Sequence, residues 1–219
     1  MFVKVCGTTS EEDALLAVAL GADAVGFVFA PSPRQVAPQR VRDIVRRLPP
    51  EVLTMGVFRD QAPERVVDIV NRADLGGAQL HGHESPEDTQ WVKARVRIVF
   101  KAFAAGDATV ARAADHGADA LVLDSARPGS GKVFDWSLAE DVPSGPRLVL
   151  AGGLHAGNVA DAVARVRPWG VDVVSGVEVE PGRKDPRLLR AFLGVAKSLS
   201  RRDVAAAAGP EPYDWQLDG

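Results

Sequence analysis

The sequence is poor in cysteine, because Cys6 is the only one among 219 residues. A single cysteine excludes an internal disulfide and a multi-thiolate zinc or iron–sulfur site. This usage fits a reducing compartment, so we expect a cytoplasmic protein. No apolar run approaches the roughly 18 residues of a membrane span, and the start lacks the basic and apolar regions of a signal peptide, so we expect neither.

The sequence also lacks an excess of either charge, with 26 Lys and Arg against 29 Asp and Glu and a net charge of -3. We therefore expect neither a nucleic acid nor an anionic membrane as a partner. Apolar residues make up 46% of the chain, and single barrels commonly take about 200–250 residues. No exposed apolar stripe stands out, so we expect a monomer, with a homodimer as the alternative.

Apolar runs of strand length alternate with helical patterns. Eight strands are predicted, at 2–6, 23–29, 52–58, 77–81, 97–103, 119–124, 147–153 and 171–176. Segments with an apolar spacing near 3.6 lie between them, for example at 10–21, 38–48, 63–73 and 155–166. The alternation predicts an α/β fold with parallel strands, and eight units predict a single (β/α)8 TIM barrel. The alternative is an open doubly wound sheet, which the absence of G-x-G-x-x-G after the first strand disfavours.

Local signals mark helix ends and a domain boundary. Ser10 and Ser85 each precede acidic residues, as helix-capping serines do, while Gly21 and Gly117 are placed to end helices. We expect the barrel, as the catalytic domain, to occupy residues 1–199. Residues 200–219 contain an alanine run and a Gly-Pro-Glu-Pro break, which predict a loosely ordered C-terminal extension.

Polar residues and glycines follow many of the predicted strands, where the active sites of such barrels lie. The candidates are Cys6, Arg34, His81, Asp124, Gly152, Gly153, Ser175 and Gly176. Each has a simpler reading, such as a buried apolar cysteine, a capping aspartate, a solvated arginine or a tight glycine turn. Their joint placement on one rim favours an active site.

Side-chain alternation places Lys4 inside the barrel, one layer below Cys6. A buried lysine needs an acidic partner, and strand eight, which neighbours strand one in a closed barrel, carries Asp172. We therefore predict a Lys4–Asp172 pair and expect the ammonium to favour the thiolate of Cys6.

The glycine segments at 152–153 and 175–176 follow strands seven and eight, the usual phosphate site of these barrels. Bare backbone N–H groups allow close approach of a phosphate. We therefore expect a phosphorylated small molecule as substrate.

At these residues the sequence resembles the phosphoribosylanthranilate isomerase family, over residues 2 to about 198. The matching segments are 4–7, 26–29, 32–34, 79–82, 123–125, 129–136, 151–154 and 175–178. Thr8 departs from the aliphatic residue usual in the family, and the C-terminal extension has no recognised counterpart.

The resemblance implies an Amadori rearrangement in tryptophan biosynthesis. N-(5-phosphoribosyl)anthranilate would become 1-(2-carboxyphenylamino)-1-deoxyribulose 5-phosphate, with Cys6 as general base and Asp124 as general acid. Arg34 would meet the anthranilate carboxylate and His81 would position the substrate. A loop with Gly131 and 134–135 would cover the site. No metal, redox or organic cofactor is expected.

Three alternatives stay open from the sequence. A histidine-pathway or dual-substrate ribose-phosphate isomerase would normally use two carboxylates, whereas Cys6 holds one of the two positions here. A metal-dependent phosphosugar epimerase would need more strand-end histidines than His81 and His83. A non-catalytic phosphometabolite-binding barrel would not require both proposed catalytic residues.

Overall fold

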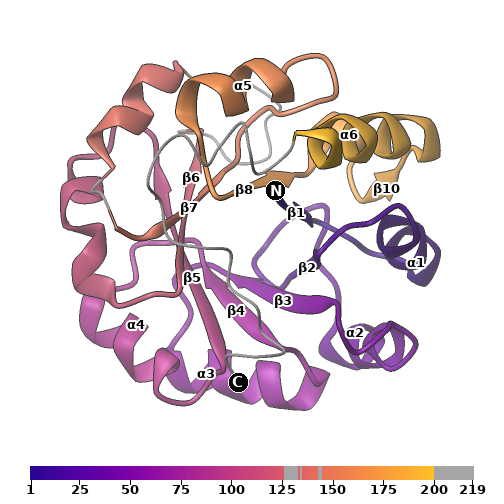
Figure 1. The fold of residues 1–219 in the computed structure, drawn as a ribbon. Coiled ribbons are helices and arrows are strands. Elements are labelled where there is room, and N and C mark those ends of the chain that lie inside the picture. Colours follow the sequence, from indigo (N-terminus) through magenta and orange to yellow (C-terminus); the bar gives the residue numbers. More distant parts are fainter. Residues whose placement is uncertain (126–132, 134, 143–144, 200–219) are drawn as a thin grey trace.

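The barrel strands form one closed parallel sheet in sequential order, as the computed structural model shows for residues 1–125, 133, 135–142 and 145–199 (Figure 1). The strands are β1 (Phe2–Val5), β2 (Ala24–Val28), β3 (Leu53–Phe58), β4 (Gly77–Leu80), β5 (Ile98–Ala104), β6 (Ala120–Asp124), β7 (Arg147–Leu150) and β8 (Gly170–Val173). The (β/α)8 TIM-barrel prediction is confirmed, and pairing of β1 with β8 excludes the open sheet. The predicted extension at 200–219 lies outside the described residues.

Helices surround the strands (Figure 1). The α-helices are α1 (Glu11–Ala19), α2 (Pro38–Val45), α3 (Pro63–Ala73), α4 (Pro86–Lys93), α5 (Val159–Val166) and α6 (Pro186–Ser198). Short 3₁₀-helices follow β5, β6 and β8, as η1 (Ala108–His116), η2 (Trp136–Asp141) and η3 (Ser175–Val177). The β5 and β6 units therefore depart from the regular strand–α-helix repeat. No helix in the described part of the chain is long and apolar enough to cross a membrane.

The predicted helix caps form as expected. Ser10 and Ser85 accept hydrogen bonds from the backbone N–H groups of Asp13 and Asp88, each at 3.1 Å. Gly21 and Gly117 adopt positive φ values of 95° and 62° at the ends of their helices, a conformation that favours glycine.

Several strands end earlier than predicted. Residues 6, 81, 152–153 and 175–176 follow their strands as loop or 3₁₀ residues. The pairing partners decide where a ladder stops, because a strand continues only where its neighbour offers matching backbone groups. The shortening leaves these residues at the rim, where strand-end side chains and bare backbone N–H groups are available for chemistry.

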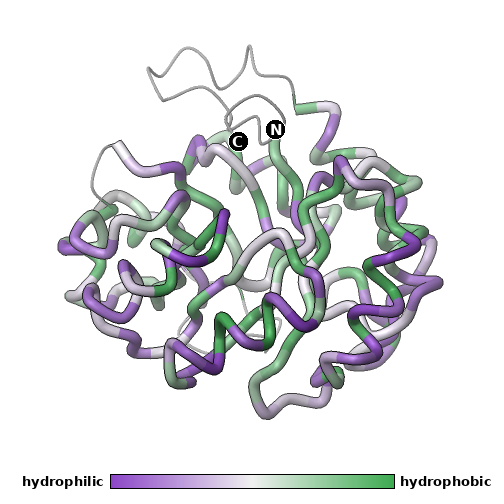
Figure 2. The backbone as a smooth tube through the Cα atoms, turned by 90° about the horizontal axis from the view of Figure 1, so that it is seen from below, coloured by the Kyte–Doolittle hydropathy of each residue, from purple (hydrophilic) through white to green (hydrophobic). Residues whose placement is uncertain are grey.

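The barrel interior changes from apolar to polar along its axis. At the N-terminal end the Phe2 and Trp169 rings stack at 4.4 Å, with Phe100 packed edge-on to Phe2 at 6.2 Å. Outside the barrel, Figure 2 shows hydrophilic and hydrophobic residues alternating along the peripheral helices, as expected when one helix face packs on the strands. The aromatic floor excludes water from below and leaves the opposite end for polar chemistry.

The predicted Lys4–Asp172 pair is confirmed at the seam that closes the barrel. The two residues are register partners in the β1–β8 ladder, and Lys4 Nζ lies 2.7 Å from Asp172 Oδ2. The Lys4 side chain is fully buried and that of Asp172 is 4% exposed. Each charge therefore depends on the other for compensation.

A second buried lysine holds the loop after β4. Lys101 Nζ donates to the Gly82 carbonyl at 2.8 Å and lies 3.0 Å from Glu84 Oε2. Glu84 also accepts from the backbone N–H groups of Asp60 and Gly82. The network fixes the segment that begins at His81.

We expect Lys101→Met to lower the free energy of unfolding by about 3–5 kcal/mol, because it leaves the Glu84 carboxylate buried without its cation. Urea titration followed by circular dichroism measures the loss. The matched control is Arg65→Met, which breaks the exposed Arg65–Asp68 pair and should cost at most about 1 kcal/mol. Equal small losses in both variants would contradict this prediction.

Candidate active site

Cys6 lies just beyond β1 and is held by the strand that closes the barrel. Its backbone N–H donates to the Val173 carbonyl at 2.9 Å, and the residue is 4% exposed. Gly26 on the neighbouring strand provides the space for the thiol, because a Cβ there would lie 2.6 Å from Cys6 Sγ. Any larger residue at position 26 would displace the sulfur.

Lys4 favours the Cys6 thiolate, as predicted, but it does not decide the net shift of the thiol pKa. Burial raises the pKa of the Cys6 thiol more than Lys4 lowers it, and Asp172 raises it further. Lys4 itself keeps a pKa above its ordinary value, since Asp172 and Cys6 together outweigh the cost of burial. The thiol is therefore a weak acid, and its thiolate is correspondingly basic.

Asp124 and His81 approach each other across the mouth. His81 Nε2 lies 3.5 Å from Asp124 Oδ2, and His81 Nδ1 lies 3.0 Å from Gln79 Nε2. If the Gln79 amide donates to Nδ1, then a proton on Nε2 faces the carboxylate. Asp124 is 7% exposed and accepts a 2.6 Å hydrogen bond from the Ser125 N–H at its other oxygen.

Charge coupling joins the Asp124 end of the site to the Cys6 end. Asp172 has a raised pKa, first because of burial and also because Asp124 lies near it, while Lys4 and His81 act in the opposite direction. The same Asp172 influences Cys6. Residues from β1, β4, β6 and β8 thus share one electrostatic cluster.

The two glycine segments meet at the rim. Gly152 and Gly153 have φ values of 84° and 67°, which favour glycine. A Cβ at Gly152 would lie 3.0 Å from Asp124 Oδ1, and a Cβ at Gly176 would collide with the Leu154 carbonyl. The structure therefore brings the loops after β7 and β8 together, with Ser175 at the start of η3.

Arg34 is already held by a protein carboxylate. Its Nε lies 3.0 Å from Glu178 Oε1 and its Nη2 lies 2.7 Å from Glu178 Oε2, in a bidentate pair. Glu178 also accepts from Lys184 Nζ at 3.0 Å. Arg34 is only 9% exposed, so it is not the solvated loop arginine of the simpler reading.

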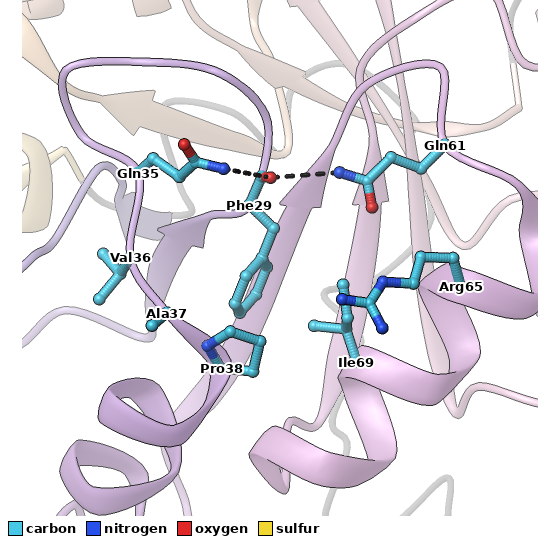
Figure 3. Close-up of a pocket in the computed structure, with 8 residues that line it drawn as sticks. All are labelled: Phe29, Gln35, Val36, Ala37, Pro38, Gln61, Arg65 and Ile69. Atoms are coloured by element: carbon cyan, nitrogen blue, oxygen red, sulfur yellow. Dashed lines mark hydrogen bonds between the residues drawn. The ribbon is translucent and has the colours of Figure 1, made fainter.

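A groove of about 550 Å³ lies away from the mouth, between α2 and α3 (Figure 3). Gln35 and Gln61 both donate to the Phe29 carbonyl, each at 3.1 Å. These bonds close the loop after β2 that carries Arg34. The groove holds none of the predicted site residues, and we assign its amides a structural role.

Two residues of this site, Glu178 and Lys184, were not predicted from the sequence. Glu178 lies in segment 175–178, which matches the family, so its carboxylate beside a strand-end glycine could have indicated a role in the site. Lys184 lies in a polar stretch with no such signal. Of the predicted covering loop, Asp135 caps η2 by accepting from the Ser137 N–H, while residues 131 and 134 lie outside the described residues.

No metal site is evident in the part of the chain that the structure describes. There, no three or more His, Cys, Asp or Glu side chains gather as potential ligands. His81 and His83 do not converge, because His81 faces Asp124 whereas His83 lies near Asp60 with its side chain 85% exposed.

A family profile, a curated relative and a solved structure identify the same family. The family profile described as N-(5'phosphoribosyl)anthranilate (PRA) isomerase matches residues 3–195. An N-(5'-phosphoribosyl)anthranilate isomerase from Desulforudis audaxviator is 48% identical over 202 residues, covering 89% of this chain and 97% of the relative. The crystal structure of phosphoribosyl anthranilate isomerase from Thermus thermophilus superposes with a TM-score of 0.86 at 44% identity, covering 91% of this chain and 100% of its own.

A further solved structure of the same family holds a ligand. It is a phosphoribosyl anthranilate isomerase in complex with reduced 1-(o-carboxyphenylamino)-1-deoxyribulose 5-phosphate. Its TM-score is 0.80 at 40% identity, covering 91% of this chain and all of that one.

We expect alkylation of Cys6 by iodoacetamide to show a higher pH midpoint in the native protein than in the urea-unfolded chain. Only the thiolate reacts, and burial raises the native pKa, so the native thiolate forms at higher pH. Mass spectrometry measures the rate against pH, and the single cysteine makes every adduct assignable. A native midpoint at or below the unfolded one would contradict the burial argument.

Proposed function

The chain belongs to the N-(5'-phosphoribosyl)anthranilate isomerase family and is an isomerase of tryptophan biosynthesis, and from that premise we propose that Asp124 and Cys6 act as its general acid and base. The observation that carries this assignment is the shared charge cluster at the strand ends, in which Asp172 is coupled to both residues. The cytoplasmic location and the monomeric state stay predictions.

Asp124 is suited to the first step, opening of the ribose ring. Its proton would pass to the ring oxygen as the C1–O bond breaks, which leaves a Schiff base between C1 and the anthranilate nitrogen. His81, 3.5 Å from Asp124 Oδ2, supports this by orienting the carboxyl group and by offering a second polar contact to the sugar. The acid acts only when it carries the proton at the start of the step.

Cys6 is suited to the second step. Its thiolate would take the C2 proton of the Schiff base, giving an enolamine that tautomerises to the aminoketose. The raised pKa of the thiol makes the thiolate scarce but strongly basic, which helps removal of a carbon-bound proton. Lys4, by opposing that rise, keeps the thiolate accessible.

Groups at opposite parts of the mouth would hold the ends of the substrate. The loops at Gly152–Gly153 and Ser175–Gly176 offer backbone approach for the phosphate. Arg34 would bind the anthranilate carboxylate, since the pair with Glu178 uses Nε and Nη2 and not Nη1. The substrate would thus be fixed at both ends while the acid and base act between them.

We expect Cys6→Ala and Asp124→Asn each to lower kcat by about a hundredfold or more, the low end for loss of a general acid or base. Phosphoribosylanthranilate is generated from anthranilate and activated ribose phosphate, and loss of anthranilate-type fluorescence reports turnover. Asp68→Asn, an exposed substitution on α3, is the matched control and should retain wild-type kcat. Near-normal kcat in either variant would remove that residue from its assigned role.

We expect Arg34→Ala to raise KM at least about tenfold, because a charge-assisted hydrogen bond to the substrate carboxylate is lost. The same fluorescence assay, run over a range of substrate concentrations, separates KM from kcat. Arg40→Ala, an exposed arginine of α2, serves as control. Unchanged KM and kcat in Arg34→Ala would remove Arg34 from the carboxylate subsite.

The substrate range of the wild type is a separate question. Equal wild-type activity on phosphoribosylanthranilate and on the histidine-pathway aminoaldose would support the dual-substrate alternative.

A further inference from the structure

A hairpin after β8 inserts two charged side chains beneath the active-site mouth. Strands β9 (Glu178–Glu180) and β10 (Arg183–Lys184) pair antiparallel, with Lys184 opposite Glu178. The Lys184 side chain is fully buried and that of Glu178 is 3% exposed. The two charges compensate each other within the hairpin, because Lys184 Nζ lies 3.0 Å from Glu178 Oε1.

Glu178 is shared by two cations. One is Arg34, in the bidentate pair, and the other is Lys184, with Nζ 3.0 Å from Glu178 Oε1. Burial alone would raise the pKa of Glu178, but the hydrogen bonds from Arg34 and Lys184 hold it below its ordinary value. The carboxylate is therefore ionised and fixed, and it limits the orientations that the Arg34 guanidinium can adopt.

Lys184 links this cluster to the proposed base. Its Nζ donates to the Cys6 carbonyl at 2.6 Å, and its backbone N–H donates to Asp13 at 3.0 Å. The Arg34 side chain packs against Gly7, the residue after Cys6, since a Cβ at Gly7 would lie 2.6 Å from Arg34 Cδ. Lys184 thus contacts the backbone at Cys6, and Arg34 contacts it at Gly7.

Arg34 and Lys184 share one carboxylate partner. Both pair with Glu178, while the buried Asp13, which accepts from the Lys184 backbone N–H, supplies a second negative charge beside them. Burial lowers the pKa of Lys184 below its ordinary value. The pair with Glu178 uses Nε and Nη2 of Arg34, so the edge of the guanidinium with Nη1 is the one that could meet a substrate anion.

We propose that Glu178 and Lys184 are positioning residues that aim Arg34 at the substrate carboxylate and fix the backbone of Cys6. The inference rests on the proposed function, in which Arg34 binds that carboxylate. Glu178 and Lys184 touch neither the substrate nor the reacting atoms. They fix the Arg34 guanidinium and the Cys6 base relative to each other. The site therefore favours a substrate whose arylamine carries a carboxylate.

Binding of two related compounds tests the proposal without requiring turnover. One is the reduced 1-(o-carboxyphenylamino)-1-deoxyribulose 5-phosphate bound by a solved relative. The other is its phenylamino counterpart, which lacks the carboxylate. Calorimetry gives Kd for each compound with the wild type and with Glu178→Gln, whose amide NH₂ cannot accept from Arg34 or Lys184.

We expect Glu178→Gln to weaken binding of the carboxylated compound at least about tenfold, the loss of one charge-assisted hydrogen bond, and to change binding of the phenylamino compound less than about twofold. The matched controls are Glu180→Gln and Arg183→Met, which break the exposed pair on the same hairpin and should bind both compounds like the wild type. Equal weakening of both compounds, or of neither, would overturn the proposal.

The double variant Glu178→Gln, Lys184→Met keeps the proposal falsifiable if the single variant does not fold, because it leaves no unpaired buried lysine at this position. It should show the same loss of discrimination and, in the turnover assay, a lower kcat from the freed Cys6 backbone. A folded double variant with wild-type discrimination would overturn the proposal. A wild-type protein that binds neither compound would instead overturn the proposed function itself, and this inference with it.

Discussion

The ion pair of Lys4 and Asp172 is the constraint on which both the barrel and its chemistry depend. It joins the first and last strands at the seam where the sheet closes, and neither charge is tolerable in this interior without the other. A slip of β1 by one residue against β8 would turn Lys4 to the opposite face and leave Asp172 buried without its cation. The same slip would move Cys6, so the pairing that closes the barrel also sets the position of the proposed base.

Buried lysines solve a second problem of a parallel barrel. Backbone carbonyls near the C-terminal strand ends run out of ladder partners just where the mouth must stay dry enough for chemistry. Lys101 donates to the carbonyls of Gly82 and Ala102, and Lys184 donates to that of Cys6. Each of these ammonium groups also meets a glutamate. The two ammonium groups therefore satisfy backbone carbonyls and glutamate side chains of the rim at once.

The sequence predicts the parts of this structure that depend on local pattern. Apolar runs give the eight strands, and alternation within one strand, combined with barrel closure, gives the Lys4–Asp172 pair. The sequence predicts the effect of Lys4 on the Cys6 thiolate but not the larger opposing effect of desolvation on the Cys6 pKa, because desolvation depends on the packed structure. The role of Lys184 cannot be predicted from the sequence for a related reason, since its partners are the Cys6 carbonyl, just beyond β1, and Glu178 of the hairpin.

The pair between Arg34 and Glu178 is compatible with the proposal that Arg34 binds the substrate carboxylate. A guanidinium has five donors in a fixed plane, so one edge can be held by the protein while the other remains available. Holding it in advance removes much of the side-chain entropy that a flexible arginine would lose on binding. Since Glu178 also shares its charge with Lys184, it offsets only part of the positive charge around it. The internal pair therefore orients the guanidinium and leaves the donors of its other edge for a second anion.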